Sequence, residues 1–88
     1  MDSIYKALWD GNRRKILELL KTKDMSVWEL LGFFDITQAS LSHHLDILKR
    51  ANLVLDERKW QFIFYSLNVS IFEEFVKWLM EFVDKNKK

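Results

Sequence analysis

The sequence contains no cysteine and no proline, and glycine occurs only at positions 11 and 32. The lack of cysteine excludes disulfide bonds and thiolate metal sites. No linker or repeat divides the chain, so we expect residues 1–88 to form a single domain. No apolar run approaches the roughly 18 residues of a membrane span, and Met1-Asp2-Ser3 has no signal-peptide character. We therefore expect a cytoplasmic protein with no membrane partner.

An excess of charge of either sign is also missing, since 14 Lys and Arg face 13 Asp and Glu and the net charge is +1. Such a balance permits nucleic-acid binding without arguing for it. The sequence has no nucleophile–base–acid set, no phosphate-binding loop and no paired carboxylates with a pocket signal. We therefore expect a protein that is not an enzyme and needs no cofactor.

Large apolar side chains, in contrast, are plentiful: 49% of the residues are hydrophobic and 15% are aromatic. A domain of 88 residues cannot bury all of them, so part of this surface is expected to face a second copy.

Helical periodicity dominates the first half of the chain. A short helix is expected around Ile4–Leu8, and Asp10 or Asn12 can cap the next helix, whose apolar stripe is Ile16, Leu19 and Leu20. Ser26 and Glu29 have the spacing of a capping box that opens a helix over 27–34.

A further helix follows a tight break at Asp35-Ile36. Thr37 is its expected cap, and its buried side carries Leu41, Leu45 and Leu48. Two helices joined by so short a turn form a helix-turn-helix.

The period then changes between Leu53 and Leu67, where β-branched and aromatic runs flank the polar segment 56–59. This pattern predicts a β-hairpin. Ser70 and Glu73 then predict a second capping box, which opens a long last helix with an apolar surface wider than one stripe. We interpret it as a dimerisation helix. The predicted fold class is α+β, mainly helical with a hairpin wing: a winged helix-turn-helix with four helices, two strands and a final helix.

Three segments resemble the ArsR family of repressors: Lys6-Ala7-Leu8 through Arg13-Arg14-Lys15-Ile16-Leu17, then Leu41-Ser42-His43-His44-Leu45-Asp46-Ile47-Leu48, then Gln61-Phe62-Ile63-Phe64-Tyr65-Ser66-Leu67-Asn68. Within the family, the chain is most similar to the short, metal-free SdpR-type autorepressors. The resemblance implies a symmetric homodimer through the first and last helices, with recognition helices in successive major grooves of double-stranded DNA. It implies repression of transcription at an inverted repeat.

For the dimer interface the resemblance and the last helix indicate these residues: Ile4, Tyr5, Leu8, Phe72, Phe75, Val76, Leu79, Phe82 and Val83. Metal sensing, the best-known activity of the family, is not expected here. The chain has no cysteine, and its two histidines, His43 and His44, are neighbours that point about 100° apart on a helix.

The residues expected to bind DNA lie on the second helix of the motif and on the wing: Thr37, Gln38, Ala39, Ser40, Ser42, His43, Arg50, Arg58 and Lys59. Capping and solvation are the alternatives for the helix residues, and a solvated hairpin tip is the alternative for the wing. His44 is expected to be partly buried, and Asp46 should repel phosphate unless an amino group or an arginine binds it. For the basic run 13–15 we favour a simple ion pair over a phosphate contact.

The chain departs from the family pattern at several positions. Trp60 occupies a wing turn where glycine is common, and positive φ there should cost about 1 kcal/mol or more. Gly32 is expected inside a helix. Two interpretations remain open for a possible added apolar surface of Trp9, Trp28, Gly32, Phe33 and Trp60. It is an extended core, or it binds a further protein or a small apolar ligand, in which case the chain is a natural or engineered scaffold.

Overall fold

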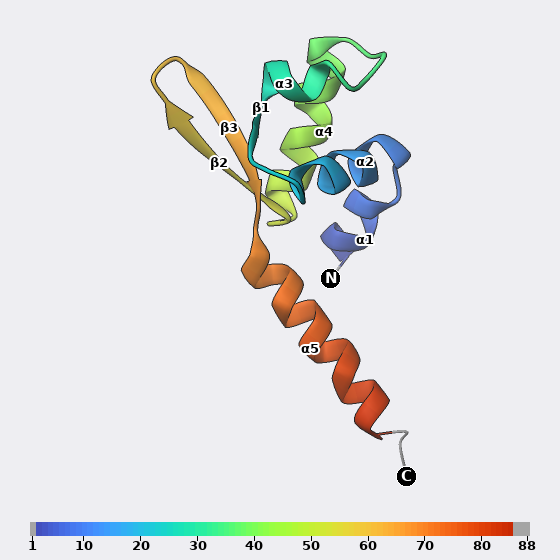
Figure 1. The fold of residues 1–88 in the computed structure, drawn as a ribbon. Helices are drawn as coiled ribbons and strands as arrows, with labels where there is room; N and C mark the ends of the chain where they lie inside the picture. The colour runs from blue at the N-terminus through green and yellow to red at the C-terminus, as the bar shows by residue number, and fades with distance from the viewer. Residues whose placement is uncertain (1, 86–88) are drawn as a thin grey trace.

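The computed structural model describes residues 2–85, which form five helices and three strands. In chain order these are α1 (Asp2–Leu8), α2 (Gly11–Leu20), β1 (Met25–Ser26), α3 (Val27–Leu31), α4 (Gln38–Arg50), β2 (Val54–Lys59), β3 (Phe62–Leu67) and α5 (Val69–Lys85). The helical body lies on one side and the β2–β3 hairpin projects from it, while α5 extends away at the opposite end (Figure 1). The predicted winged helix-turn-helix order is confirmed.

The core lies where α2, α3 and α4 meet the base of the hairpin. Its largest fully buried side chains are Ile16, Leu30, Leu41, Leu45, Leu48 and Val54. The leucines of α4 recur at the spacing of one helical face, so this face is buried and the opposite face is left to solvent. Truncating such a leucine to alanine typically costs about 2–5 kcal/mol.

A third strand was not predicted from the sequence. The two residues of β1 pair antiparallel with β3, Met25 opposite Tyr65 and Ser26 opposite Phe64, so the sheet order is β1-β3-β2. A segment of two residues is too short to show a period of its own. The pairing attaches the base of the wing to the start of α3.

Local hydrogen bonds set most helix ends where the sequence predicts them. Asp10 rather than Asn12 caps α2, because its carboxylate accepts from the backbone N–H groups of Asn12 and Arg13. The capping box of Ser26 and Glu29 is confirmed in both directions.

Two predicted helix boundaries were wrong. The helix expected over 27–34 ends at Leu31, and Gly32 follows as its C-cap with a φ of −61°, so no glycine lies inside a helix. A Cβ on Gly32 would lie 3.4 Å from the Glu29 carbonyl oxygen, so this position does not require glycine. α5 begins at Val69, two residues before the start expected after a cap at Ser70, so Ser70 lies inside the helix rather than at its cap.

The end of α4 turns sharply toward the wing. Asn52 has a φ of 62°, its N–H donates to the Lys49 carbonyl, and the N–H of Leu53 donates to the Leu48 carbonyl. This pair of bonds is a Schellman motif. It places Leu53, which is 2% exposed, back against the core and directs the chain into β2.

The hairpin turn consists of Trp60 and Gln61 alone, since Lys59 pairs with Phe62. Trp60 has a φ of 62°, and it is the only residue of the turn in the positive-φ region. This confirms the positive φ expected at the wing turn. A non-glycine residue in this region costs about 1–2 kcal/mol. None of the described helices is long and apolar enough to cross a membrane.

Candidate nucleic-acid interface

The start of α4 is the exposed end of the helix-turn-helix. Thr37 caps the helix, and its hydroxyl oxygen accepts from the Ser40 N–H at 3.1 Å. Thr37, Gln38 and Ala39 are exposed, whereas Ser40 is half-buried. The first turn therefore presents short polar side chains and unpaired backbone N–H groups, which suit a phosphate or a base edge.

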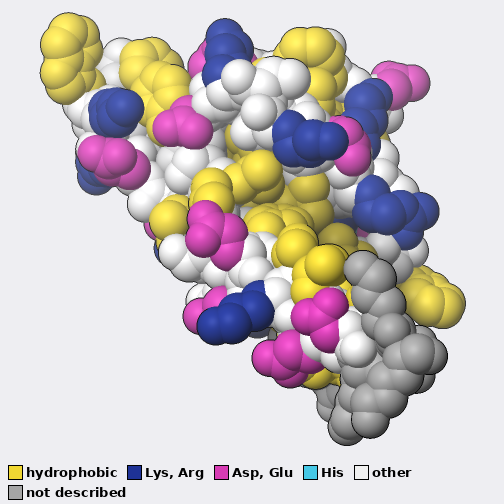
Figure 2. Space-filling view, turned by 60° about the horizontal axis from the view of Figure 1, so that its bottom comes forward, with side chains coloured by type: hydrophobic (Ala, Val, Ile, Leu, Met, Phe, Trp, Pro, Cys, Tyr) yellow, Lys and Arg dark blue, Asp and Glu magenta, His cyan; other side chains and the backbone are white. Residues whose placement is uncertain are grey.

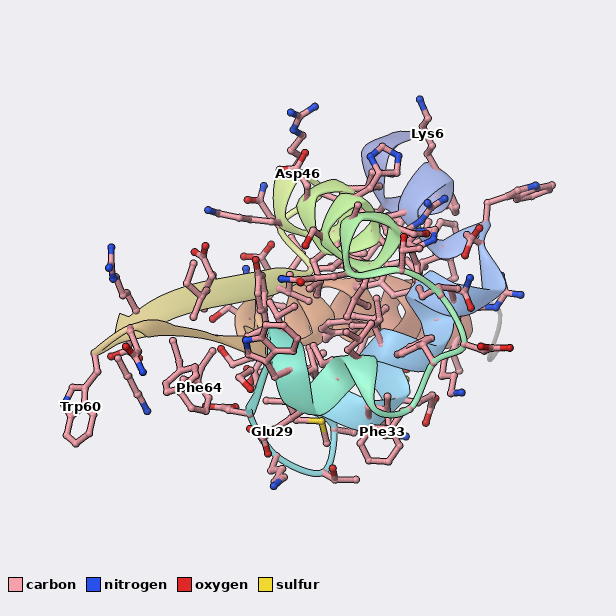
Figure 3. The ribbon with its side chains drawn as sticks, turned by 90° about the horizontal axis from the view of Figure 1, so that it is seen from above. Lys6, Glu29, Phe33, Asp46, Trp60 and Phe64 are labelled. Carbon is pink, nitrogen blue, oxygen red and sulfur yellow. The ribbon has the colours of Figure 1, made fainter. Side chains whose placement is uncertain are left out.

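The exposed face of α4 continues through Ser42, His43, Asp46 and Arg50. The Asp46 carboxylate binds Arg50 Nε at 3.1 Å, one helical turn away, and both side chains are at least half exposed. Asp46 thus has the arginine partner that was expected from the sequence as one way to avoid repelling phosphate. Figure 3 shows Asp46 on the outer side of α4. Asp46 therefore offsets the positive charge of Arg50 on this face.

The wing turn and the start of α4 lie at the same end of the molecule, opposite α5 (Figure 1). Arg58 and Lys59 are both exposed. Arg58 Nε donates to the Trp60 carbonyl at 3.1 Å, and the Lys59 ammonium lies 5.5 Å from the centre of the Phe64 ring. Both cations are therefore held near the turn rather than being fully free.

An ion pair joins the wing to the helix-turn-helix. Lys49 at the end of α4 binds Asp56 on β2 at 2.9 Å. The hydrogen bond and the charge of Asp56 raise the pKa of Lys49. Burial, followed by the charge of Asp56, raises the pKa of Tyr65 on the neighbouring strand. The pair holds the wing base against α4.

His44 points inward, as expected, with 12% of its side chain exposed. Its Nδ1 lies 3.2 Å from Arg13 Nη1, and Asp10 Oδ1 lies 4.0 Å from the same nitrogen. A guanidinium can only donate, so Nδ1 is the acceptor in this contact. His44 therefore attaches α4 to the junction between α1 and α2.

The basic run at the start of α2 binds carbonyl groups, and the simple ion pair expected from the sequence was wrong. Arg13 donates to the carbonyls of Ala7 at 2.7 Å and Lys6 at 3.1 Å, and Arg14 donates to the Leu8 carbonyl. Cations at a helix C-terminus satisfy its free carbonyls and favour its dipole.

Lys15 acts in the same way on the turn after α3. Its ammonium donates to the Phe33 carbonyl at 2.6 Å and lies 4.7 Å from the centre of the Phe34 ring. Sequence reasoning missed these roles, although a cationic run directly after a short helix is the signal that could have indicated them.

Burial raises the pKa of Asp10, but its backbone hydrogen bonds from Arg13 and Asn12 and the nearby His44 and Arg13 outweigh this effect. The pKa of this carboxyl therefore falls below its ordinary value of 3.8. The hydrogen bond from Lys23, followed by that from Ser26, lowers the pKa of Glu29 below 4.5. Both carboxyl groups are therefore anionic at neutral pH.

The residues expected at a dimer interface lie on α1 and α5. Ile4, Leu8, Phe72 and Phe75 are half-buried, and the exposed ones are Tyr5, Val76, Leu79, Phe82 and Val83. Figure 2 shows apolar side chains gathered in the hollow between the body and α5.

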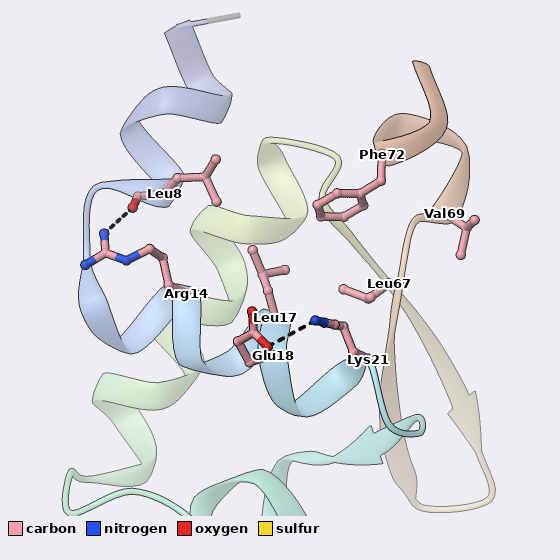
Figure 4. A pocket seen from close by; sticks show the side chains of 8 residues that line it. All are labelled: Leu8, Arg14, Leu17, Glu18, Lys21, Leu67, Val69 and Phe72. Atoms are coloured by element: carbon pink, nitrogen blue, oxygen red, sulfur yellow. Dashed lines mark hydrogen bonds and ion pairs between the residues drawn. The ribbon is translucent and has the colours of Figure 1, made fainter. Parts of the chain in front are cut away.

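Part of this hollow is a groove of about 500 Å³ between α1, α2 and the start of α5, and its apolar lining includes Leu8, Leu17 and Phe72 (Figure 4). Beyond Phe75, the apolar face of α5 packs little against the rest of the same protomer.

The proposed aromatic surface is distributed over separate elements. Trp9 follows α1 and is 85% exposed, Trp28 on α3 is 60% exposed, and Trp60 is 94% exposed. Phe33 and Gly32 lie in the turn after α3 and are also exposed. Figure 3 shows Trp60 at the outer end of the wing and Phe33 on the helical body, well apart. Within residues 2–85, no ring contact joins the three tryptophans.

Two helices joined by a tight turn and followed directly by a β-hairpin define a winged helix-turn-helix protein. Residues 10–55 match the family described as "Bacterial regulatory protein, arsR family". The chain belongs to this ArsR family and is a DNA-binding regulator, which confirms the resemblance seen in the sequence. Its fold and relatives are those of transcriptional regulators, not enzymes.

The similarity extends over almost the whole chain. The chain is 45% identical to the "Transcriptional repressor SdpR" of Bacillus subtilis (strain 168), over 97% of this chain and 94% of that protein. The structure of HlyU from Vibrio cholerae is 30% identical, with a TM-score of 0.75, and the match covers 91% of this chain and 87% of that one. An ArsR-like transcriptional regulator from Rhodococcus sp. RHA1 has a TM-score of 0.84 at 23% identity over 96% and 77% of the two chains, which shows the shared fold.

Proposed function

We propose that residues 1–88 act as one DNA-binding domain that represses transcription as a homodimer on an inverted-repeat operator. The observation that carries this proposal is the exposed face of α4. Gln38 and Ser42 make no side-chain hydrogen bond within residues 2–85, so their polar groups are available for base edges. The similarity to a protein named as a transcriptional repressor supports repression as the outcome. The protein acts in the cytoplasm, where this DNA is found.

The dimer is formed by α1 and α5. Their apolar side chains are too exposed for a lone protomer, with Leu79 at 43%, Val76 at 55% and Val83 at 50%. Contiguous apolar surface of this kind marks an interface. Since α1 and the wing lie on opposite sides of α4, such a dimer points its two wings outward (Figures 1 and 3).

The repressor does not sense a metal ion. Within the described residues, no group of three or more His, Cys, Asp or Glu side chains is placed to hold one. His44 already binds Arg13 through Nδ1, and His43 faces outward on α4. The two histidines therefore point in different directions, which supports a repressor without a metal site.

DNA binding is tested by fluorescence anisotropy on a duplex enriched from a random pool, with a scrambled duplex as comparison. We expect specific binding at physiological salt that weakens steeply as salt rises, because phosphate contacts release counterions. Ser42→Ala and His43→Ala should each weaken specific binding by about 1–3 kcal/mol, the usual value of a base contact.

Ser70→Ala is the matched control, because Ser70 is exposed on α5, away from α4 and the wing. It should bind as tightly as the unmodified protein. Equal affinity for the enriched and scrambled duplexes at every salt concentration would contradict the repressor proposal.

A second candidate function is binding of a protein or small apolar ligand through the aromatic side chains. The observation that favours it is a hollow of about 180 Å³ between α3 and the wing, lined by Trp28, Phe62 and Ile63 among others. Apolar binding there would persist at high salt, whereas specific DNA binding would not.

A further inference from the structure

Trp60 is the most exposed large apolar side chain among the described residues, with an exposed fraction of 94%. Its indole makes no ring contact or hydrogen bond there, and only its backbone carbonyl is used, by Arg58. The side chain therefore contributes almost nothing to the stability of the wing.

The backbone conformation at this position is also unfavourable for a tryptophan. Trp60 is the first residue of a two-residue turn and has a φ of 62°. Two-residue turns with positive φ at the first position only are type II′ turns, which favour glycine at that position. The wing thus keeps a bulky residue where both burial and backbone conformation disfavour it. Strain of this kind leads from an observed outlier to a hypothesis of function.

The surroundings of the indole indicate what it contacts. Arg58 and Lys59 directly precede it in the chain, and both are exposed cations at the tip of the wing. The tip lies at the same end of the molecule as the start of α4, and it lies on the side of α4 away from α1 (Figures 1 and 3). A flat apolar ring beside two cations suits the DNA minor groove, because phosphates border that groove. Proteins insert such side chains into the minor groove beside arginine and lysine.

We propose that Trp60 is a specificity-determining DNA contact, and that its indole enters the minor groove at the outer flank of each half-site. Its backbone turn presents the ring, and Arg58 and Lys59 hold the flanking phosphates. Because the guanine amino group projects into the minor groove, the indole favours A·T pairs at the flank. This inference rests on the proposed DNA-binding function and adds a contact that the recognition helix does not make.

The test uses the full chain and the enriched operator duplex. Trp60→Ala should weaken binding by about 5- to 150-fold, the range seen when an aromatic ring stacked on a base is removed. The slope of affinity against salt should stay unchanged, because no charge is lost. Lys59→Ala should instead reduce that slope by about one phosphate contact. Trp9→Ala, which removes another highly exposed indole (85%) outside the wing, should bind normally.

Two further readouts separate a DNA contact from a structural role. Replacing A·T by G·C at the flank should weaken binding of the unmodified protein but not of Trp60→Ala. In protein labelled with 5-fluorotryptophan, the ¹⁹F signal of Trp60 should move when the operator binds, while that of Trp78 on α5 should not. Trp60→Gly, which suits the turn, should fold at least as well and still bind weakly.

The proposal is overturned if Trp60→Ala binds the operator within twofold of the unmodified protein and the ¹⁹F signal of Trp60 stays in place. In that case the proposed repressor function stands. Absence of specific binding by the unmodified protein would overturn the proposed function and this inference together.

Discussion

Arg13 offers a direct test of how the recognition helix is held. Its guanidinium donates to the Ala7 carbonyl at 2.7 Å and the Lys6 carbonyl at 3.1 Å, and it lies 3.2 Å from His44 Nδ1. α1 has only seven described helical residues, too few to be stable by itself. One side chain therefore joins the end of α1 to the middle of α4.

The expected cost of Arg13→Ala follows from these three contacts. A typical hydrogen bond contributes about 0.5–1.5 kcal/mol net, and bonds with a charged partner contribute more. The bond to Lys6 is exposed and lies at the low end, whereas the other two are part-buried. We expect Arg13→Ala to lower the free energy of unfolding by about 2–3 kcal/mol. Arg13→Lys should recover less than half, since an ammonium cannot reach three separated acceptors.

The assay is urea unfolding followed by circular dichroism at one fixed protein concentration, because a dimer gains stability with concentration. Arg14→Ala is the matched control. Its guanidinium makes one exposed bond, to the Leu8 carbonyl, and should cost about 1 kcal/mol or less. In a double-mutant cycle, Arg13→Ala and His44→Ala should show a coupling of about 0.5 kcal/mol or more. A loss no larger than that of Arg14→Ala, with no coupling to His44, would refute this reasoning.

Three further predictions concern the proposed dimer interface, the turn between α4 and β2, and the cap of α2. Leu79→Glu, on the exposed face of α5, should convert the proposed dimer into a monomer in sedimentation at tens of micromolar, and a dimer that survives it would place the interface elsewhere. Asn52→Ala should cost about 1–2 kcal/mol in urea unfolding because alanine fits a φ of 62° poorly, whereas Asn52→Gly should cost less, and equal losses would contradict a backbone cause. Because the pKa of Asp10 is lowered in the fold, its charge stabilises the protein above about pH 4, and this contribution is lost as the pH falls through 3.8 toward the folded value. The advantage of the unmodified protein over Asp10→Asn in unfolding experiments should therefore shrink between pH 7 and pH 3, and a constant difference would contradict the charged cap.

The sequence alone determined the class of the fold. Leucines at helical spacing in α4, the capping box of Ser26 and Glu29, and the change of period after Leu53 depend on neighbours within a few residues. Such local signals are readable because burial and capping repeat along the chain with a fixed period. They were sufficient for the helix-turn-helix and the wing, and the family resemblance rested on the same segments.

Contacts between distant segments were decided only by the tertiary structure. No local pattern shows that Arg13 reaches His44, that two residues of β1 join the wing sheet, or that Lys49 binds Asp56. A polar side chain has many candidate partners in the sequence, and the packed core selects one by bringing it within hydrogen-bonding distance. The position of Trp60 combines both kinds of information. A wing turn at Trp60 could be expected locally, but the polar residues 56–59, expected between the strands, lie within β2. Only the folded hairpin shortens the turn to two residues and places the bare indole at the same end as the recognition helix.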